Sequence, residues 1–400
     1  MSILDKKTKA KNVLETLAAA RTADQREAGY ADTLREILQQ PQTWQGTAEL
    51  VNQPEVARIF AHALASKPTH IVLTGSGSSM YIGESIAPTL QAGLGIPVQA
   101  IAAGTLLTHW RGVLPPGSGL LVSLARSGDS PESCGVVSRL LDEAPEWRHL
   151  VITCNAKGKL ATLYRDEQRV DVVVLDERTN DRSLVMTSSF SNLLLAGSGL
   201  LHDTAGALRL DAQAPLSENV RRVFDHHGDA IAAIAQRDMT SAVYLGSGGG
   251  IGVAHEAALK MLEMTGGKVI TLAETFLGLR HGPMSAVHPG TLIVAFLSSD
   301  ATVRGYEIDL LRELSRKGLG LGKLIVGEGI PADLLDDRDV AIELEGLAPY
   351  GELPTLLADV VVGQLLAFFR CLQLGDTPDT PSQGVLTRVV GEFVIHGATP

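Results

Sequence analysis

The chain repeats one pattern of residues 171 positions apart. The segment 71–79 (IVLTGSGSS) returns as 242–250 (AVYLGSGGG), and 119–123 (GLLVS) returns with the same offset as 290–294 (GTLIV). Each copy is an apolar run that ends in a turn of glycine and serine, which is typical of a strand leading into a loop. A repeat of this length decides the domain organisation, so we expect two similar units.

The apolar runs predict an α/β fold, with two doubly wound parallel-sheet units preceded by an N-terminal helical segment. Near-continuous apolar strands separated by helices indicate a parallel sheet that is covered on both faces. The expected strands lie at 70–74, 119–124, 149–153, 170–175, 241–245, 290–297, 323–326 and 339–344. We expect the helical segment over 1–50, the first unit over 51–210 and the second over 211–400. Ligands of such folds bind at the carboxyl ends of the strands.

Composition excludes several classes of partner. The net charge of −11 argues against nucleic acid or an anionic membrane as the main partner, because both require a basic face. Cys134, Cys154 and Cys371 show no CxxC pair and no Cys/His ligand spacing, so we expect reduced thiols and no metal. The polar, basic start Met1 to Lys11 lacks the apolar core of a signal peptide. We therefore expect a cytoplasmic protein.

The segment 123–133 (SLARSGDSPES) is the first candidate site. A buried strand ends here, and Ser130 followed by proline and glutamate has the order of an N-cap and a first helical turn. The backbone N–H groups of a helix start attract anions, and Ser127, Ser130 and Arg126 add side-chain donors. Helix capping alone would also explain these residues.

The turn 75–79 (GSGSS) is the second candidate, and it contributes Ser78 and Ser79. It lacks the third glycine and the later acidic residue of a dinucleotide fingerprint. Two serine-rich turns at adjacent strand ends would suit one phosphate monoester better than a pyrophosphate. Alone, such a turn is a weak signal.

The second copy of the repeat serves as a control for the first. Where the first copy has 126–131 (RSGDSP), the second has 297–302 (LSSDAT), which lacks the arginine and the proline. The helix cap of the first copy is therefore expected to be dispensable for the fold. This favours a functional role for Arg126, Ser127 and Ser130.

The helix expected after 242–250 carries charged residues on one face. Glu256, Lys260 and Glu263 are spaced i, i+4 and i+7, which places them on the same side of a helix. A solvated row of ion pairs would have this spacing too. The neighbouring residues are mostly small or apolar, so we expect the stripe to face something other than open solvent. A glutamate beside a lysine in a partly dry site is a candidate proton-transfer base.

The segment 274–283 (ETFLGLRHGP) adds a histidine in a rigid turn, because Gly-Pro follows His281 and restricts the backbone. A single histidine in a loop is more often a surface residue. His281 is thus a weaker candidate when it is taken alone.

Taken in order, these segments resemble the sugar isomerase (SIS) domain family, and more closely its galactosamine-6-phosphate deaminase/isomerase group, also called tagatose-6-phosphate ketose/aldose isomerases. The resemblance covers about residues 50 to 390. It implies an enzyme without metal or organic cofactor that acts on a hexosamine 6-phosphate and assembles as a homodimer or a larger homo-oligomer.

The resemblance also implies roles for individual residues. The phosphate would be held by Ser78, Ser79, Arg126, Ser127 and Ser130. Glu263, with Lys260 beside it, would move a proton between the first two carbons of the sugar. His281 would assist ring opening from the neighbouring subunit, and Thr187 would contact the substrate. The isomerase half of glucosamine-6-phosphate synthase, which the chain also resembles, carries a lysine in its C-terminal tail, and Arg388 is the nearest basic residue to that place here.

Three functions stay open at this point. The first is deamination of galactosamine 6-phosphate to tagatose 6-phosphate and ammonia. The second is a plain aldose–ketose isomerase or a glucosamine-6-phosphate deaminase, which would use the same base and ring-opening residue. The third is a non-catalytic sugar-phosphate sensor; it is disfavoured because the chain is acidic and has both Glu263 and His281.

Overall fold

The computed structural model describes residues 12–201, 210–382 and 384–396, so the predicted lack of a signal peptide in Met1 to Lys11 lies outside the described residues. By internal contacts the chain forms two compact units. The β1–β5 unit comprises Gln42–Asp181, Ser188–Leu210 and Thr387–Pro400. The β6–β10 unit comprises Met1–Pro41, Arg182–Thr187 and Asp211–Leu386. Each unit contains one parallel sheet, as the sequence predicts, and each sheet has five strands where the sequence predicts four.

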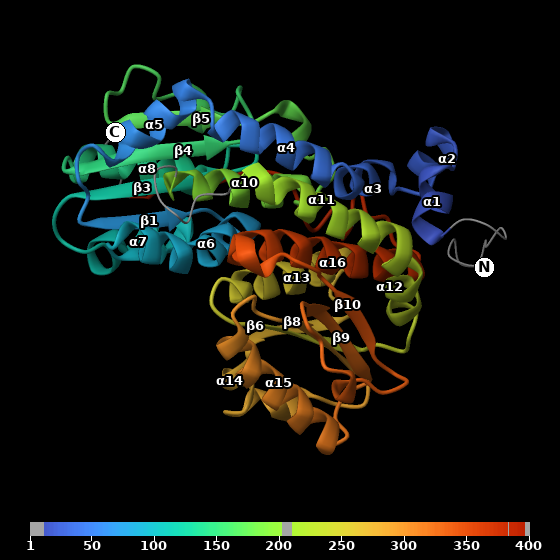
Figure 1. The fold of residues 1–400 in the computed structure, drawn as a ribbon. Coiled ribbons are helices and arrows are strands. Elements are labelled where there is room, and N and C mark those ends of the chain that lie inside the picture. Colours follow the sequence, from blue (N-terminus) through green and yellow to red (C-terminus); the bar gives the residue numbers. More distant parts are fainter. Residues whose placement is uncertain (1–11, 202–209, 383, 397–400) are drawn as a thin grey trace. The chain divides into compact units, whose positions relative to one another are not determined.

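The β1–β5 unit has the strand order β2-β1-β3-β4-β5 (Figure 1). Its strands are β1 (His70–Thr74), β2 (Val98–Ala100), β3 (Gly119–Ala125), β4 (Trp147–Thr153) and β5 (Val170–Val174). Its helices are α5 (Pro54–Leu64), α6 (Ser78–Leu94), α7 (Ala103–Val113), α8 (Pro131–Glu143), α9 (Lys159–Thr162) and α10 (Ser188–Gly197). Helices α7 and α8 pack on one face of the sheet, where they bury Val72, Leu121 and Val151. Helices α5, α6 and α10 contact the strands as well, so the sheet is covered by helices.

The β6–β10 unit has the strand order β10-β9-β8-β6-β7. Its strands are β6 (Ser241–Gly246), β7 (Ile270–Thr275), β8 (Thr291–Phe296), β9 (Gly322–Gly327) and β10 (Val340–Glu343). Its helices include α11 (Gln213–Arg222), α12 (Gly228–Ala235), α13 (Gly250–Met264), α14 (Phe276–Leu279), α15 (Ala301–Arg316) and α16 (Glu352–Gln373). Numbered from its own first strand, this sheet has the same order as β1–β5. In both units the order reverses direction beside the first strand, where such folds bind ligands.

The N-terminal part is helical, as predicted. Helices α1 (Val13–Ala18), α2 (Thr22–Glu27) and α3 (Ala31–Leu38) belong to the β6–β10 unit, and α4 (Gln40–Val51) leads into the β1–β5 unit. Helix α16 is long and apolar enough to cross a membrane by length and composition. Its apolar window is entirely buried, and it contacts α11, α12 and α13, so it is placed as a core helix.

The two units share the backbone of their first turn. Gly77 (φ 56°) and Gly248 (φ 55°) occupy matching positions, and both have the positive φ that favours glycine. Two residues earlier, a Cβ on Gly75 would lie 2.4 Å from Ser79 Cβ, and one on Gly246 would lie 2.1 Å from Gly250 O. These glycines are therefore required by the turn itself in both units.

The sequence did not predict two strands, β2 and β7, and they occupy the same place in the two sheets. Each lies at one edge, paired only with the first strand of its unit. Strand β2 has three residues, of which only Val98 is buried, and no residue of β7 is buried. Edge strands of this kind lack the continuous apolar run that marks the central strands.

One expectation about helix capping was wrong. Helix α15 of the second copy corresponds to α8 of the first, and it does have a cap. The carboxylate of Asp300 accepts hydrogen bonds from the N–H groups of Thr302 and Val303. In α8, by contrast, Ser130 is the N-cap residue but its side chain makes no capping hydrogen bond. The second copy thus keeps a capping residue, one position before the one that matches Ser130.

Candidate active site

The turn after β1 places Ser78 and Ser79 in the first turn of α6. Both side chains are buried at the N-terminus of this 17-residue helix. The N-terminus of a helix of this length carries a positive partial charge and N–H groups without intrahelical partners. This is a suitable setting for an anion.

The turn after β3 lies beside it, because β1 and β3 are neighbours in the sheet. Arg126 and Ser127 are buried, and Ser130 is half-buried at the start of α8. The turn is tightly held: Ser127 Oγ accepts a bond from Asp129 N (3.2 Å), and Ser127 O accepts one from Asn155 Nδ2 (2.8 Å). The structure therefore brings all five predicted phosphate ligands to the carboxyl ends of two adjacent strands.

Arg388 also belongs to the β1–β5 unit. Its guanidinium donates to Asn180 Oδ1 (2.5 Å) and to the carbonyl of Asp181. Burial raises the pKa of the Cys154 thiol to about 12, while the positive charges of Arg126 and Arg388 act in the opposite direction. The charges of both guanidinium groups thus act at the end of β4, the strand that pairs with β3.

In the β6–β10 unit, α13 carries the predicted charged face, and two of its three charged residues are buried. Glu256 and Lys260 are buried, and the Glu263 side chain is 22% exposed. Lys260 Nζ lies 2.5 Å from Glu263 Oε2 and 3.4 Å from Glu256 Oε1. A fully buried lysine requires such partners, because an unpaired charge is costly to bury.

Glu263 opens onto a cavity of about 490 Å³. The walls are apolar at Leu259 and Leu262 of α13, and the Lys268–Asp376 ion pair (2.6 Å) also contributes. The C-terminal segment forms another wall through residues that include Ser382, whose hydroxyl donates to Glu263 O (2.9 Å). A cavity of this size suits a small metabolite.

His281 lies two residues beyond the end of α14, and it is exposed. Its backbone N–H donates to Gly278 O (2.9 Å), and the following Gly282 has a φ of 121°. Within the described residues, no hydrogen bond or ion pair joins its imidazole to Glu263 or to any other group. The imidazole is thus accessible from outside the chain.

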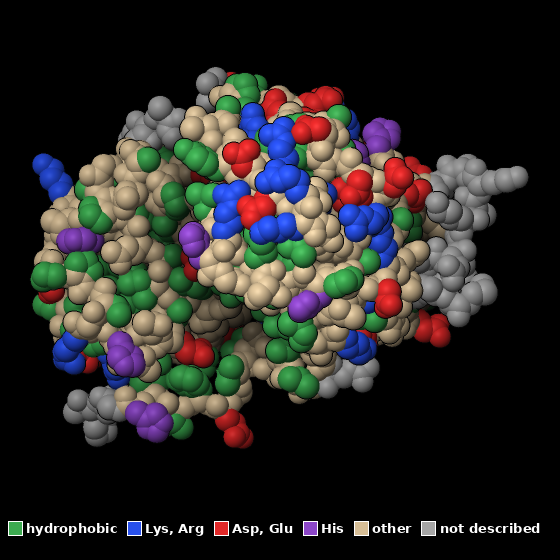
Figure 2. All heavy atoms as spheres, turned by 90° about the horizontal axis from the view of Figure 1, so that it is seen from below, with side chains coloured by type: hydrophobic (Ala, Val, Ile, Leu, Met, Phe, Trp, Pro, Cys, Tyr) green, Lys and Arg blue, Asp and Glu red, His purple; other side chains and the backbone are tan. Residues whose placement is uncertain are grey.

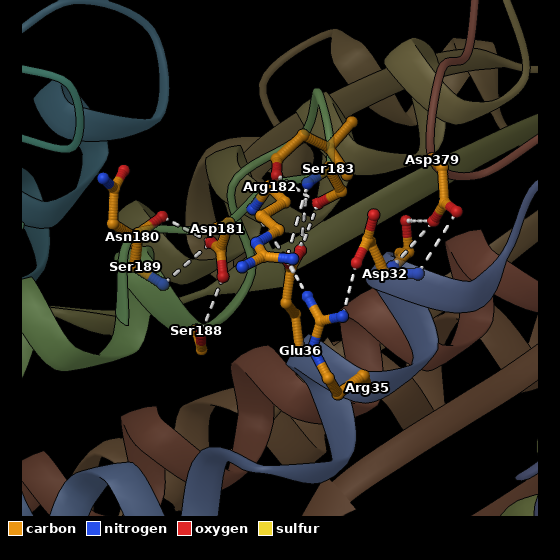
Figure 3. A network of polar contacts seen from close by, with 12 residues as sticks. Asp32, Arg35, Glu36, Asn180, Asp181, Arg182, Ser183, Ser188, Ser189 and Asp379 are labelled. Atoms are coloured by element: carbon orange, nitrogen blue, oxygen red, sulfur yellow. Dashed lines mark hydrogen bonds and ion pairs between the residues drawn. The ribbon is translucent and has the colours of Figure 1, made fainter. Parts of the chain in front are cut away.

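Thr187 is buried at the end of a short segment, Arg182–Thr187, of the β6–β10 unit. Glu36 of α3 holds the start of this segment by accepting bonds from Arg182 N (2.6 Å) and Ser183 Oγ (2.5 Å), as Figure 3 shows. At the other end, Gln364 of α16 donates to Thr187 O (3.1 Å). Helices α3 and α16 therefore fix the backbone of the segment that carries Thr187.

A second carboxylate orders the neighbouring residues of the β1–β5 unit. Asp181 accepts bonds from the hydroxyls of Ser188 and Ser189 (2.6 Å each) and from Ser189 N (2.8 Å), at the start of α10 (Figure 3). Because its backbone carbonyl also accepts from Arg388, Asp181 connects the start of α10 to the C-terminal tail.

Acidic and basic side chains are intermingled on the face of the molecule drawn in Figure 2. Among the ion pairs of the chain, Arg312 of α15 pairs with Asp309 and with Asp333 of the following segment. The residues drawn in colour there form no continuous basic surface of the kind that nucleic acid requires.

The tandem α/β units and these side chains define the class of tandem SIS-domain proteins. No protein-family model matches the chain. It is 33% identical over 367 residues to D-galactosamine-6-phosphate deaminase AgaS of Shewanella sp. (strain ANA-3), with 90% of each chain covered. It is 32% identical to the protein of the same name from Escherichia coli O157:H7, over 91% of this chain and 95% of the relative. The chain belongs to the D-galactosamine-6-phosphate deaminase AgaS family.

A solved structure agrees with this assignment. The tagatose-6-phosphate ketose/aldose isomerase from Escherichia coli superposes with a TM-score of 0.83 and 29% identity, over 95% of this chain and 99% of that one. The resemblance stated from the sequence is thereby confirmed.

Sequence reasoning missed the cavity wall at Ser382 and the anchor Glu36. Ser382 meets Glu263 across 119 positions of sequence, and Glu36 meets Ser183 across 147. Such contacts are created by the fold and leave no local pattern, so no periodicity or motif could have revealed them.

Proposed function

We propose that this protein is a galactosamine-6-phosphate deaminase/isomerase that converts galactosamine 6-phosphate and water to tagatose 6-phosphate and ammonia. The observation that carries the proposal is the partly exposed Glu263, which a buried lysine holds at the edge of a metabolite-sized cavity. The names of the relatives at 32–33% identity support the same activity.

The phosphate of the substrate binds to the β1–β5 unit. Ser78, Ser79, Ser127 and Ser130 donate hydroxyl hydrogen bonds, and Arg126 adds a charge-assisted one. Arg388 adds a second positive charge on the same unit. The support for these roles is the position of both turns at the carboxyl ends of neighbouring strands.

The β6–β10 unit moves the proton. His281 assists opening of the sugar ring, and Glu263 takes the proton from the second carbon and returns it to the first. The enolamine becomes a ketimine, and water then releases ammonia and leaves the ketose. The substrate nitrogen supplies the electrophilic assistance, so these residues suffice without a cofactor. Lys260 engages Glu263 Oε2 and fixes the orientation of the carboxylate, and Thr187 contacts the substrate.

Ammonia release by the purified protein tests the activity. Galactosamine 6-phosphate, glucosamine 6-phosphate and the unaminated hexose 6-phosphates are compared at equal concentrations. We expect ammonia chiefly from galactosamine 6-phosphate. Turnover of the unaminated sugars without ammonia from either amino sugar would instead identify a plain aldose–ketose isomerase, and binding without any turnover would identify a sensor.

We further propose a cytoplasmic homo-oligomer in which His281 completes the site of a neighbouring chain. The exposed imidazole supports this arrangement, and the free thiols of Cys134, Cys154 and Cys371 support the compartment. Mixing the inactive variants Glu263→Gln and His281→Ala tests the shared site. In a dimer, random exchange restores about a quarter of the sites. A mixture that exchanges subunits and stays inactive would contradict the proposal.

A further inference from the structure

The first and third strands of the β6–β10 unit end in the same kind of turns as β1 and β3. Ser298 corresponds by the repeat to Ser127, and Asp300 N donates to Ser298 Oγ (3.1 Å), as Asp129 N does to Ser127 Oγ. Gly249, at the N-terminus of the 15-residue α13, corresponds to Ser78 at the start of α6. The backbone of an anion-binding site is therefore present twice in the chain. We call the turns after β1 and β3 the first cradle and the turns after β6 and β8 the second cradle.

In the β6–β10 unit this cradle holds carboxylates of the chain itself. Glu307 of α15 is buried, and its Oε2 accepts a bond from Ser298 N (2.8 Å). Glu352, at the start of α16, accepts a bond from Gly249 N (3.2 Å) through Oε1. The two carboxylates thus bond to the positions that match Ser127 and Ser78 of the other unit.

The donors around these carboxylates resemble those of a phosphate site. Ser247 corresponds to Ser76, and its hydroxyl forms a hydrogen bond to Glu307. Arg304 donates to Ser298 O (2.9 Å), and its positive charge acts on Glu307. Hydroxyls, helix-start N–H groups and one guanidinium are the same set of groups that the β1–β5 unit directs at its own site.

A third acid, Asp359 of α16, is buried beside them. Within the described part of the chain its Oδ1 has no hydrogen-bond partner. Burial raises the pKa of Asp359 well above its ordinary value, and the charges of Glu307 and Glu352 act in the same direction. Burial raises the pKa of Glu307 too, whereas Ser298, Ser247 and Arg304 oppose that shift.

The β1–β5 unit has nothing equivalent to Glu307. The matching position on α8 is Val136, which is buried in the apolar cluster under the sheet. The first cradle therefore lacks the carboxylate that Glu307 supplies in the second.

We propose that Glu307 and Glu352 are the resident anions of the second cradle, in the place that a phosphate monoester takes in the first. Their presence limits the chain to one phosphate site. The comparison with the first cradle rests on the proposed phosphate position in the β1–β5 unit, whereas the assignment of Glu307 and Glu352 as resident anions does not. It predicts that removing both carboxylates creates a second phosphate site, with Ser247, Ser298 and Arg304 as donors.

Equilibrium dialysis with inorganic phosphate tests the proposal by counting bound phosphate per chain. The wild type should bind one, and Glu307→Val combined with Glu352→Ala should bind two. Asp309→Asn, an exposed change on the same helix, is the matched control and should bind one. A folded double variant with the wild-type count would overturn the inference. If the wild type binds none and the double variant one, the proposed phosphate position fails and this inference stands.

A second measurement covers a double variant that does not fold. Phosphate should raise the melting temperature of the single variant Glu352→Ala by about 2–4 °C more than that of the wild type, because the added anion replaces the lost carboxylate. Chloride at equal ionic strength is the control. Equal responses of the variant and the wild type to phosphate would overturn the proposal.

Discussion

The turns that follow β1 and β6 share a backbone and differ in what they surround. Both use a glycine that approaches the next helix closely and a glycine with positive φ. Around the first turn lie serines and an arginine, whereas Glu307 and Glu352 occupy the surroundings of the second. The two copies thus share the backbone geometry of the turn and differ in the charged side chains around it, which is the basis for proposing phosphate binding in the first copy only.

The helices that follow these turns differ in the same way. Helix α6 has Ser85 and Pro88 in its middle, whereas α13 carries Glu256, Lys260 and Glu263. A charged, buried row is costly to maintain in a core, so its presence in only one copy indicates a task that belongs to that copy.

The largest expected effect comes from removing the proposed base. Glu263→Gln keeps the size of the side chain and should lower kcat about 10²–10⁴-fold, the range for a lost general base. KM should change little. Steady-state ammonia release measures both, and Glu55→Gln, an exposed glutamate on α5, is the control. Near-normal turnover would show that Glu263 is not the base.

Placing an acid in the first cradle should nearly match this effect. Val136→Glu introduces at the matching position the carboxylate that the second cradle contains. Repulsion between it and the phosphate should raise KM at least about 10²-fold, because like charges in a partly buried site cost several kcal/mol. Val136→Gln, of similar size and neutral, separates charge from packing. Equal KM values for the two folded variants would contradict the assignment of this cradle.

Removing donors from the first cradle should have a smaller effect. Arg126→Gln should raise KM about 10–100-fold, since a hydrogen bond to a charged group contributes roughly 1.5–3 kcal/mol. Ser127→Ala should raise it less. Arg165→Gln, an exposed change in the same unit, provides the comparison. If kcat fell and KM did not move, Arg126 would act in chemistry rather than in phosphate binding.

The smallest expected effect concerns pH and the second cradle. The pKa values of Asp359 and Glu307 are raised in the folded state, so both groups bind protons more tightly in the folded chain than in the unfolded chain. The stability that this protonation contributes is complete at acidic pH and is lost as the pH rises through the raised pKa values. Asp359→Asn should flatten this fall in melting temperature as the pH rises above the ordinary pKa of an aspartate. An unchanged slope in the variant would mean that Asp359 does not titrate in this range.

Much of the fold follows from the sequence, because the central strands are continuous apolar runs and the first turns repeat. Strands β2 and β7 were not predicted, because edge strands need no continuous apolar run. The buried Glu256 and Lys260 were expected to avoid open solvent, since small and apolar residues surround them in the sequence.

The second cradle could not be predicted in this way. Glu307, Glu352 and Asp359 come from two helices, and only the fold brings the first of them to the start of α16. Comparing the two copies of the repeat suggested that the second had lost its helix cap, whereas Asp300 had taken over that role. An alignment of the two copies by a fixed offset does not detect a capping role that lies one position earlier in the second copy.

The division of roles between the two units is tested most directly by equilibrium binding of galactosamine 6-phosphate to Glu263→Gln, with Arg126→Gln measured beside it. The account predicts that Glu263→Gln binds one sugar phosphate per chain with an affinity within about threefold of the KM of the wild type, while Arg126→Gln binds about 10–100-fold more weakly. Loss of binding in Glu263→Gln, with binding retained in Arg126→Gln, would contradict it.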